Sequence, residues 1–226
     1  MRMMTARHFG AAKKAIRALG DYYNSAPNDQ NPLLPYPSGP LEFTFEYAPI
    51  VGAAQLNLHQ GKLVFRGKSA EGYVFIKFVR RYSKEAHDKC SELGFAPRLK
   101  AFSRVHAGWY MVVMDYVAEE YEELYDALPR LSIEERRDIT QELARNVRSF
   151  HKAGFVHGDI RNTNVMVKKS GGKGVYLVDF DWAGKHPNAK YPMHINRETV
   201  IRPDGAADGE VITQEHDMFM IERLAG

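Results

Sequence analysis

The chain has 226 residues, a formal net charge of +3 and 44% hydrophobic residues, which is ordinary for a globular protein with one large domain or two small ones. No apolar stretch approaches the roughly 18 residues that a membrane span needs, and so small a charge does not indicate a nucleic-acid partner. Cys90 is the only cysteine, which excludes an intrachain disulfide, and no secretory leader is recognisable. We therefore expect an intracellular protein, cytoplasmic or also nuclear.

The first forty residues differ in composition from the rest. Residues 1–20 carry five basic side chains and no acidic one, at Arg2, Arg7, Lys13, Lys14 and Arg17. A helix with a solvated basic face, a docking element for an acidic partner and an organelle-targeting presequence all fit this pattern, and the first is favoured. Five prolines then fall between Pro27 and Pro40, a composition that resists helix and sheet. Residues 1–40 are therefore predicted to be a basic helix and a Pro-rich linker.

Short segments rich in aromatic and β-branched residues follow, and they predict an antiparallel sheet with one helix after its third strand. Ser83 is the predicted N-cap of that helix. Ala86, Cys90 and Leu93 recur at helical spacing, and Gly94 is predicted to end the helix after about Leu93. The predicted strands are Phe43–Val51, Lys62–Arg66, Tyr73–Val79, Leu99–Val105 and Trp109–Met114.

The second half of the chain is predicted to be mainly helical. Ser132-Ile133-Glu134-Glu135 is a capping box, and it opens a long helix that should end between His151 and Gly154. Val165–Val167 and Val175–Val178 predict a hairpin, residues 184–210 look irregular, and a last helix should run from about Thr213 to Leu224. The buried stripe of the long helix is predicted to be Ile139, Leu143, Val147 and Phe150.

The residues that carry chemistry lie on either side of the predicted hairpin. The sequence reads His157-Gly158-Asp159-Ile160-Arg161-Asn162-Thr163-Asn164, and Asp179-Phe180-Asp181 begins fifteen residues later. One carboxylate can orient a hydroxyl while an amide and a second carboxylate hold a metal ion, which is the set needed to move a γ-phosphoryl from Mg·ATP. The alternative is a structural turn in which His157 and Asp159 bind buried backbone groups. We favour phosphoryl transfer.

The motifs and their order over about residues 41–226 resemble the protein-kinase-like superfamily. The resemblance implies an α+β, bilobal fold: an N-lobe over residues 41–114 with a small antiparallel sheet and one helix, a hinge at 115–118, and a minimal, mainly helical C-lobe over 119–226. Asp159 would position the acceptor hydroxyl and take its proton, and Arg161 would touch the γ-phosphate. Asn164 and Asp179 would hold Mg²⁺.

The resemblance also assigns nucleotide-binding residues in the sheet lobe and the hinge. Lys77, in Val74-Phe75-Ile76-Lys77, looks like the phosphate-binding lysine, although a lone strand lysine usually faces solvent. Its expected partner is Glu85 in the following helix, with Glu92 as the substitute and a plain surface carboxylate as the alternative. Asp115 and Val117 would meet the adenine through their backbone groups.

Near the C-terminus, Asp217 begins the last predicted helix. By analogy with the superfamily it could anchor the catalytic loop from below. An ordinary carboxylate that complements the helix dipole is an equally good interpretation.

Three departures from the protein-kinase pattern bear on activity. Gly158 stands where protein kinases usually have Arg, and the His-Gly-Asp form is shared with aminoglycoside and choline kinases and with the small kinase of the KEOPS complex. Asp181 replaces the usual Gly, and no G-x-G-x-x-G precedes Lys77. The run Asp-Phe-Asp-Trp-Ala-Gly also resembles small fungal kinase-like proteins.

The sequence therefore predicts an ATP- and Mg²⁺-dependent phosphotransferase, an atypical kinase whose acceptor is a protein Ser or Thr. A pseudokinase that binds nucleotide or another protein is the first alternative, because the Gly-rich loop is missing and Asp181 replaces the usual Gly. A small-molecule kinase is the second, and it would need an acidic acceptor pocket that so short a C-lobe is poorly able to build.

Overall fold

The computed structural model describes residues 44–49, 63–69, 71–105 and 108–225. The predicted basic helix and Pro-rich linker of residues 1–40 lie outside this part of the chain. Within it, no helix is both long enough and apolar enough to cross a membrane.

The N-terminal part is one antiparallel sheet of five strands in the order β1-β2-β3-β5-β4. Its strands are β1 (Thr44–Pro49), β2 (Leu63–Ser69), β3 (Gly72–Val79), β4 (Leu99–Arg104) and β5 (Tyr110–Asp115). Side chains alternate along β3, so Val74, Ile76 and Phe78 pack into one cluster while Phe75 and Val79 pack into another. Lys77 shares the face of Phe75 and Val79, as the alternation predicts.

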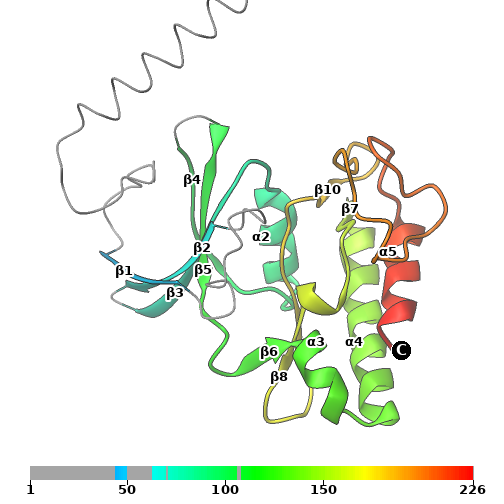
Figure 1. Cartoon of the computed structure of the whole chain (residues 1–226), viewed down its shortest axis with the longest axis horizontal. Helices are drawn as coiled ribbons and strands as arrows, with labels where there is room; N and C mark the ends of the chain where they lie inside the picture. The colour runs from blue at the N-terminus through cyan, green and yellow to red at the C-terminus, as the bar shows by residue number, and fades with distance from the viewer. Residues whose placement is uncertain (1–43, 50–62, 70, 106–107, 226) are drawn as a thin grey trace, which may run out of the picture. The chain divides into compact units, whose positions relative to one another are not determined.

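Helix α2 (Lys84–Glu92) begins where the sequence indicates. The Ser83 side chain accepts a hydrogen bond from the Ala86 backbone N–H, and Leu93 is the C-cap. Figure 1 draws α2 between the sheet and the C-terminal part. Its buried residues Ala86 and Cys90 belong to the large core of the C-terminal part and not to the clusters of the sheet.

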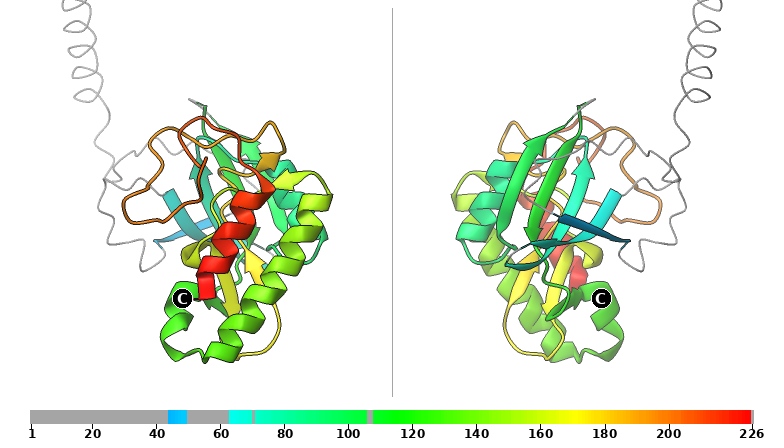
Figure 2. Two further views of the ribbon diagram at one scale, coloured as in Figure 1. Left: turned by 90° about the vertical axis from the view of Figure 1, so that its right-hand side faces the viewer. Right: turned by 90° about the vertical axis from the view of Figure 1, so that its left-hand side faces the viewer.

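The long helix α4 (Ile133–Lys152) dominates the C-terminal part. The Ser132 capping box is formed in both directions, and Leu143, Val147 and Phe150 are fully buried in the main core while Ile139 packs at its edge. Helix α5 (Gln214–Glu222) lies beside α4, as the left view of Figure 2 shows.

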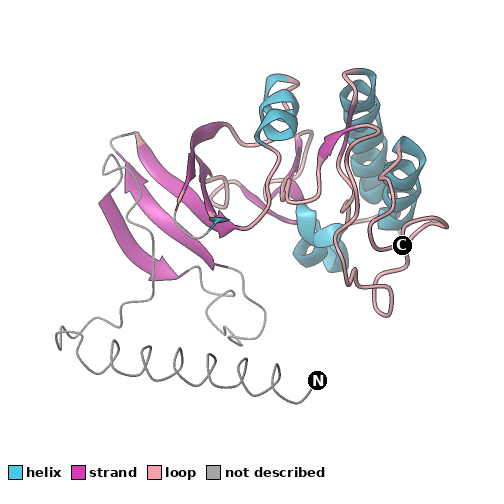
Figure 3. Cartoon of the chain, turned by 90° about the horizontal axis from the view of Figure 1, so that it is seen from above, coloured by secondary structure: helices cyan, strands magenta, loops and turns pink. Residues whose placement is uncertain are grey.

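Short elements complete this part. They are β6 (Tyr121–Glu123), α3 (Leu124–Ala127), β7 (Phe155–Val156), β8 (Val165–Lys168), β9 (Val175–Leu177), β10 (Gly184–Lys185) and the 3₁₀ turns Leu128–Arg130, Asn162–Asn164 and Arg223–Ala225. The hairpin β8–β9 is confirmed, with β6 as a third strand beside β8. The sequence analysis missed β6, α3 and the two-residue pair β7 and β10. Figure 3 shows the strands of the sheet gathered on one side and the helices on the other.

Candidate functional site

The loop that follows β7 is held from below by the first turn of α5. Asp217 is 1% exposed, and its Oδ2 and Oδ1 accept hydrogen bonds from the backbone N–H groups of His157 and Gly158, each at 2.8 Å. His151 Nε2, at the end of α4, lies 3.0 Å from the same Oδ2. The sequence left two interpretations of Asp217 open, an anchor of the catalytic loop and an ordinary carboxylate at a helix start. These hydrogen bonds show that Asp217 anchors the loop.

Gly158 occupies a position that excludes a side chain. Its φ is +82°, and a Cβ there would lie 2.6 Å from Cδ1 of Ile212, a residue that is fully buried. Left-handed backbone also disfavours any residue with a Cβ. Packing therefore explains why Gly158 stands where protein kinases usually have Arg. The Ile212 side chain fills the space that a side chain at residue 158 would need.

Asp159 lies in the same loop with its carboxylate almost completely buried. Asn164 Nδ2 donates to Asp159 Oδ2 at 3.0 Å and to the Asp159 carbonyl at 2.8 Å. Arg161 Nε lies 3.3 Å from Oδ2, and Arg202 Nη2 donates to Oδ1 at 2.9 Å. One amide and two guanidinium groups therefore hold this carboxylate in place.

Arg202 is a residue that the sequence analysis missed. Its side chain is 2% exposed, its Nε donates to the Asn196 carbonyl at 3.1 Å, and its guanidinium lies 4.7 Å from the centre of the Trp182 ring. It comes from the irregular segment between β10 and α5, where no periodicity or motif distinguishes one arginine from another. Only the fold brings it to Asp159.

Lys77 reaches across from the sheet to the Asp-Phe-Asp motif. Its Nζ lies 2.6 Å from Asp179 Oδ1 and 2.8 Å from Asp181 Oδ1, and the residue is 6% exposed. Burial would lower the pKa of Lys77, but the two carboxylates outweigh burial and raise it above its ordinary value. Burial and the neighbouring Asp179 raise the pKa of Asp181 to about 7, against the opposing effect of Lys77.

A backbone hydrogen bond brings the start of the Asp-Phe-Asp motif close to Asn164. The Val178 backbone N–H donates to the Asn164 carbonyl at 3.0 Å, which brings the residue before Asp179 onto the end of the loop. Asn164 Nδ2 is used by Asp159, whereas Oδ1 accepts only a long hydrogen bond, from Thr163 Oγ1 at 3.5 Å, so Oδ1 is the amide atom that could also bind a cation. An amide oxygen and carboxylates form the donor set that Mg²⁺ prefers, so the residues present fit this ion.

Phe180, between the two aspartates, is clamped by α2. Its ring stacks on His87 with the centroids 4.6 Å apart and the planes at 7°, and its carbonyl accepts from the Ser83 backbone N–H at 3.1 Å. Tyr82 Oη lies 2.7 Å from His87 Nδ1, and His87 Nε2 lies 2.7 Å from the Pro97 carbonyl. Burial lowers the pKa of His87, which favours the neutral ring.

The predicted pairing of Lys77 with Glu85 is wrong. Glu85 is exposed, and its Oε2 lies 2.7 Å from Lys185 Nζ. The substitute, Glu92, pairs with Lys89 on its own helix. The cap at Ser83 fixes the phase of α2 so that Ala86, His87 and Cys90 are buried, and both glutamates are consequently exposed.

The hinge residues lie where β5 leaves the sheet. Asp115 ends β5 with its carboxylate 3.1 Å from Lys100 Nζ, and the Val117 carbonyl accepts from the backbone N–H groups of Glu120 and Tyr121. Their contact with adenine stays a prediction.

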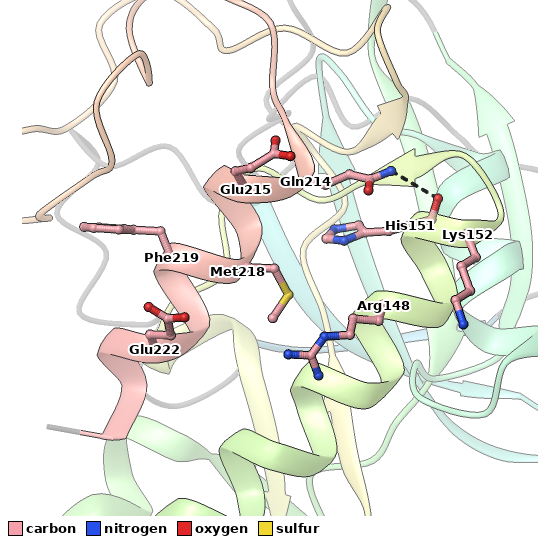
Figure 4. A pocket seen from close by; sticks show the side chains of 8 residues that line it. All are labelled: Arg148, His151, Lys152, Gln214, Glu215, Met218, Phe219 and Glu222. Atoms are coloured by element: carbon pink, nitrogen blue, oxygen red, sulfur yellow. Dashed lines mark hydrogen bonds between the residues drawn. The ribbon is translucent and has the colours of Figure 1, made fainter.

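A separate groove of about 550 Å³ lies between α4 and α5 (Figure 4). Gln214 Nε2 donates to the His151 carbonyl at its rim at 3.3 Å. Its lining residues are Arg148, His151, Lys152, Gln214, Glu215, Met218, Phe219 and Glu222. No residue that converges on Lys77 or Asp159 is among them.

Comparison with known proteins agrees with this geometry. The chain is 38% identical over 73 residues to the KEOPS complex subunit Bud32 of Pyrococcus abyssi (strain GE5 / Orsay), which covers 32% of this chain and 31% of that one. It is 26% identical over 161 residues to the RIO-type serine/threonine-protein kinase Rio2 of Methanocaldococcus jannaschii, covering 66% and 58%. It is also 26% identical over 177 residues to the serine/threonine-protein kinase AfsK of Streptomyces griseus, covering 70% and 21%. The chain thus spans between 21% and 58% of the length of these relatives.

A solved structure shows the same fold. The Cydia pomonella granulovirus kinase PK-1 superposes with a TM-score of 0.59 at 18% identity, over 77% of this chain and 70% of that one. This likeness supports the small bilobal, kinase-like arrangement of sheet and helices. The protein kinase domain family matches residues 97–220, just over half of the 226 residues. On this evidence the chain belongs to the protein kinase family.

Proposed function

We propose that the protein is an ATP- and Mg²⁺-dependent phosphotransferase that transfers the γ-phosphoryl group to the hydroxyl of a protein Ser or Thr. The observation that carries the proposal is the convergence of Lys77 with Asp179 across the two lobes. Asp159 and Asn164 stand next to them through the contact of Val178 with Asn164. This neighbourhood supports the proposal that Lys77 is the phosphate-binding cation and that Asn164 and Asp179 are ligands of a metal ion.

Each residue has a role in this proposal. Asp159 Oδ atoms accept the hydrogen of the acceptor hydroxyl, which orients its oxygen for attack and gives the proton a destination. Arg161, partly exposed beside Asp159, neutralises charge on the transferred group. Asn164 Oδ1 and Asp179 would hold Mg²⁺, which neutralises phosphate charge when bound. Lys77 would contact the phosphates, and the backbone of Asp115 and Val117 would meet the adenine.

A protein acceptor rests on the relatives. Two of them are named serine/threonine-protein kinases, and a third is named as a subunit of a complex, which also supports a protein partner. Since the chain covers only part of each relative, acceptor and partner are proposals for this protein.

The experiment compares three variants with the wild type. Asp159→Asn should slow ADP release with a panel of protein acceptors by about 10²–10⁴-fold while leaving Mg·ATP affinity nearly intact. Asp179→Asn should instead remove the Mg²⁺ dependence of nucleotide binding. Asp138→Asn, at an exposed site on α4, is the matched control and should change neither. Full turnover in Asp159→Asn would reject the role of that carboxylate.

A nucleotide-binding pseudokinase is the second candidate. It is favoured by the two carboxylates that engage Lys77 at 2.6 and 2.8 Å, because a nucleotide must compete with them for this ammonium. Melting temperature with and without Mg·ATP separates the candidates. A shift accompanied by ADP release supports the enzyme, a shift without it in every acceptor tested supports the pseudokinase, and no shift contradicts both.

A further inference from the structure

Lys77 needs a counter-charge that does not leave when a metal ion binds. A buried ammonium is costly unless it is paired, and Lys77 is 6% exposed. Asp179, its nearer partner at 2.6 Å, is the proposed metal ligand. When Asp179 turns its oxygens to a cation, Lys77 keeps only its second partner.

Helix α2 does not provide that partner in the described part of the chain. Its three acidic residues all pair with neighbouring lysines: Glu85 with Lys185, Asp88 with Lys84 and Glu92 with Lys89. Its inward face carries an alanine, an imidazole and a thiol, at Ala86, His87 and Cys90. The imidazole is already bound to Tyr82 and to the Pro97 carbonyl.

Asp181 is the second carboxylate that contacts Lys77. Its Oδ1 lies 2.8 Å from Lys77 Nζ, and its side chain is 29% exposed. The backbone around it is held by the segment between β3 and α2: the Ser83 N–H donates to the Phe180 carbonyl at 3.1 Å, and Arg81 Nη2 donates to the Trp182 carbonyl at 3.4 Å and to the Lys190 carbonyl at 2.7 Å. A carboxylate held this firmly can position an ammonium.

We propose that Asp181 is the positioning residue of Lys77, and that it does from the Asp-Phe-Asp motif what a carboxylate of α2 would otherwise do. This rests on the proposed function, since Lys77 must be aimed at phosphate for its positioning to matter. The replacement of Gly by Asp at residue 181 is then an adaptation for nucleotide binding and not a sign of lost activity.

The first test uses nucleotide binding. Asp181→Asn keeps the volume and removes the charge, so the Kd for Mg·ATP should rise about tenfold or more with the Mg²⁺ half-saturation unchanged. Asp181→Glu should recover part of the affinity. Glu85→Gln is the matched control and should bind as the wild type does. The KM for ATP should follow the Kd, whereas kcat at saturating ATP should change little.

The second test asks whether Asp181 acts through Lys77. In a Lys77→Met background, Asp181→Asn should add no further loss of affinity. Equal losses in both backgrounds, an unchanged Kd in Asp181→Asn, or a shifted Mg²⁺ half-saturation would overturn the inference, the last because it would make Asp181 a metal ligand.

A third measurement needs no nucleotide. The free energy of unfolding in urea is measured for the wild type, Lys77→Met, Asp181→Asn and the double variant, and it should show a coupling energy between residues 77 and 181. The corresponding cycle with Lys77→Met and Glu85→Gln should show none. If this coupling is present while the wild type binds no nucleotide, the ion pair exists but the proposed function has failed, and the positioning role falls with it. If the wild type binds nucleotide without this coupling, the inference alone has failed.

Discussion

The anchor at Asp217 gives the sharpest prediction for stability. Its carboxylate accepts from two backbone N–H groups at 2.8 Å and is 1% exposed. In Asp217→Asn a single amide oxygen remains, so one buried N–H loses its acceptor, at about 1–3 kcal/mol. The other hydrogen bond loses its charge, at about 1 kcal/mol. We therefore expect the free energy of unfolding to fall by about 2–4 kcal/mol.

The assay is urea unfolding followed by circular dichroism, with a thermal scan beside it. For a protein of this size the loss corresponds to a drop in Tm of about 4–16 °C. Asp138→Asn, the exposed carboxylate on α4, should stay within about 0.5 kcal/mol of the wild type. If Asp217→Asn unfolds at the same urea concentration as this control, the loop is not held as described and the reasoning is refuted.

Three further predictions concern packing, charge and pH. Gly158→Ala should destabilise the protein by about 2–4 kcal/mol, because the backbone at residue 158 is left-handed, with φ of +82°, and the added Cβ would press on Ile212. Adding Ile212→Val should recover part of this loss in urea unfolding. If the double variant instead loses the sum of the two single losses in free energy of unfolding, the contact is contradicted. Arg202→Met should cost about 3 kcal/mol in the wild type, since it removes the buried guanidinium that binds Asp159 Oδ1, and clearly less in an Asp159→Asn background; equal costs would disprove the pair. Because burial lowers the pKa of His87 from its ordinary 6.5, only the unfolded chain takes up this proton readily, so the stabilisation is complete above pH 6.5 and is lost as the pH falls below it. The urea midpoint should therefore fall on acidification, and less steeply in His87→Gln; parallel pH profiles would argue against it.

Local signals in the sequence were sufficient for most of the fold. The caps at Ser83 and Ser132 involve residues only three positions away, and the alternation along β3 involves neighbours only. The face of Lys77 and the starts of α2 and α4 could therefore be predicted. The spacing from Asp159 to Asn164 also resembles the protein kinase family closely enough to indicate the catalytic loop, although the roles of these residues stay predictions.

What could not be predicted depends on packing between distant segments. The partner of Glu85 is Lys185 in β10, about 100 positions away along the chain, and the nine residues of α2 do not specify that contact. Arg202 meets Asp159 across 43 positions from a segment without regular structure. The pairing of β6 with β8 likewise joins residues about 45 apart, Tyr121 with Lys168 among them, and three residues are too few to show a period.

The stack of His87 on Phe180 has a mechanical consequence. Together with the hydrogen bond from the Ser83 N–H to the Phe180 carbonyl and the burial of Ala86 and Cys90 in the C-terminal core, it attaches α2 to the C-terminal part. We therefore expect the motion that opens the site to a nucleotide to be a displacement of the five-stranded sheet relative to α2 and the C-terminal part. The segments that join the sheet to α2 and to β6 would be its hinges. Amide exchange slowed by nucleotide should accordingly be largest along the sheet and smallest along α2.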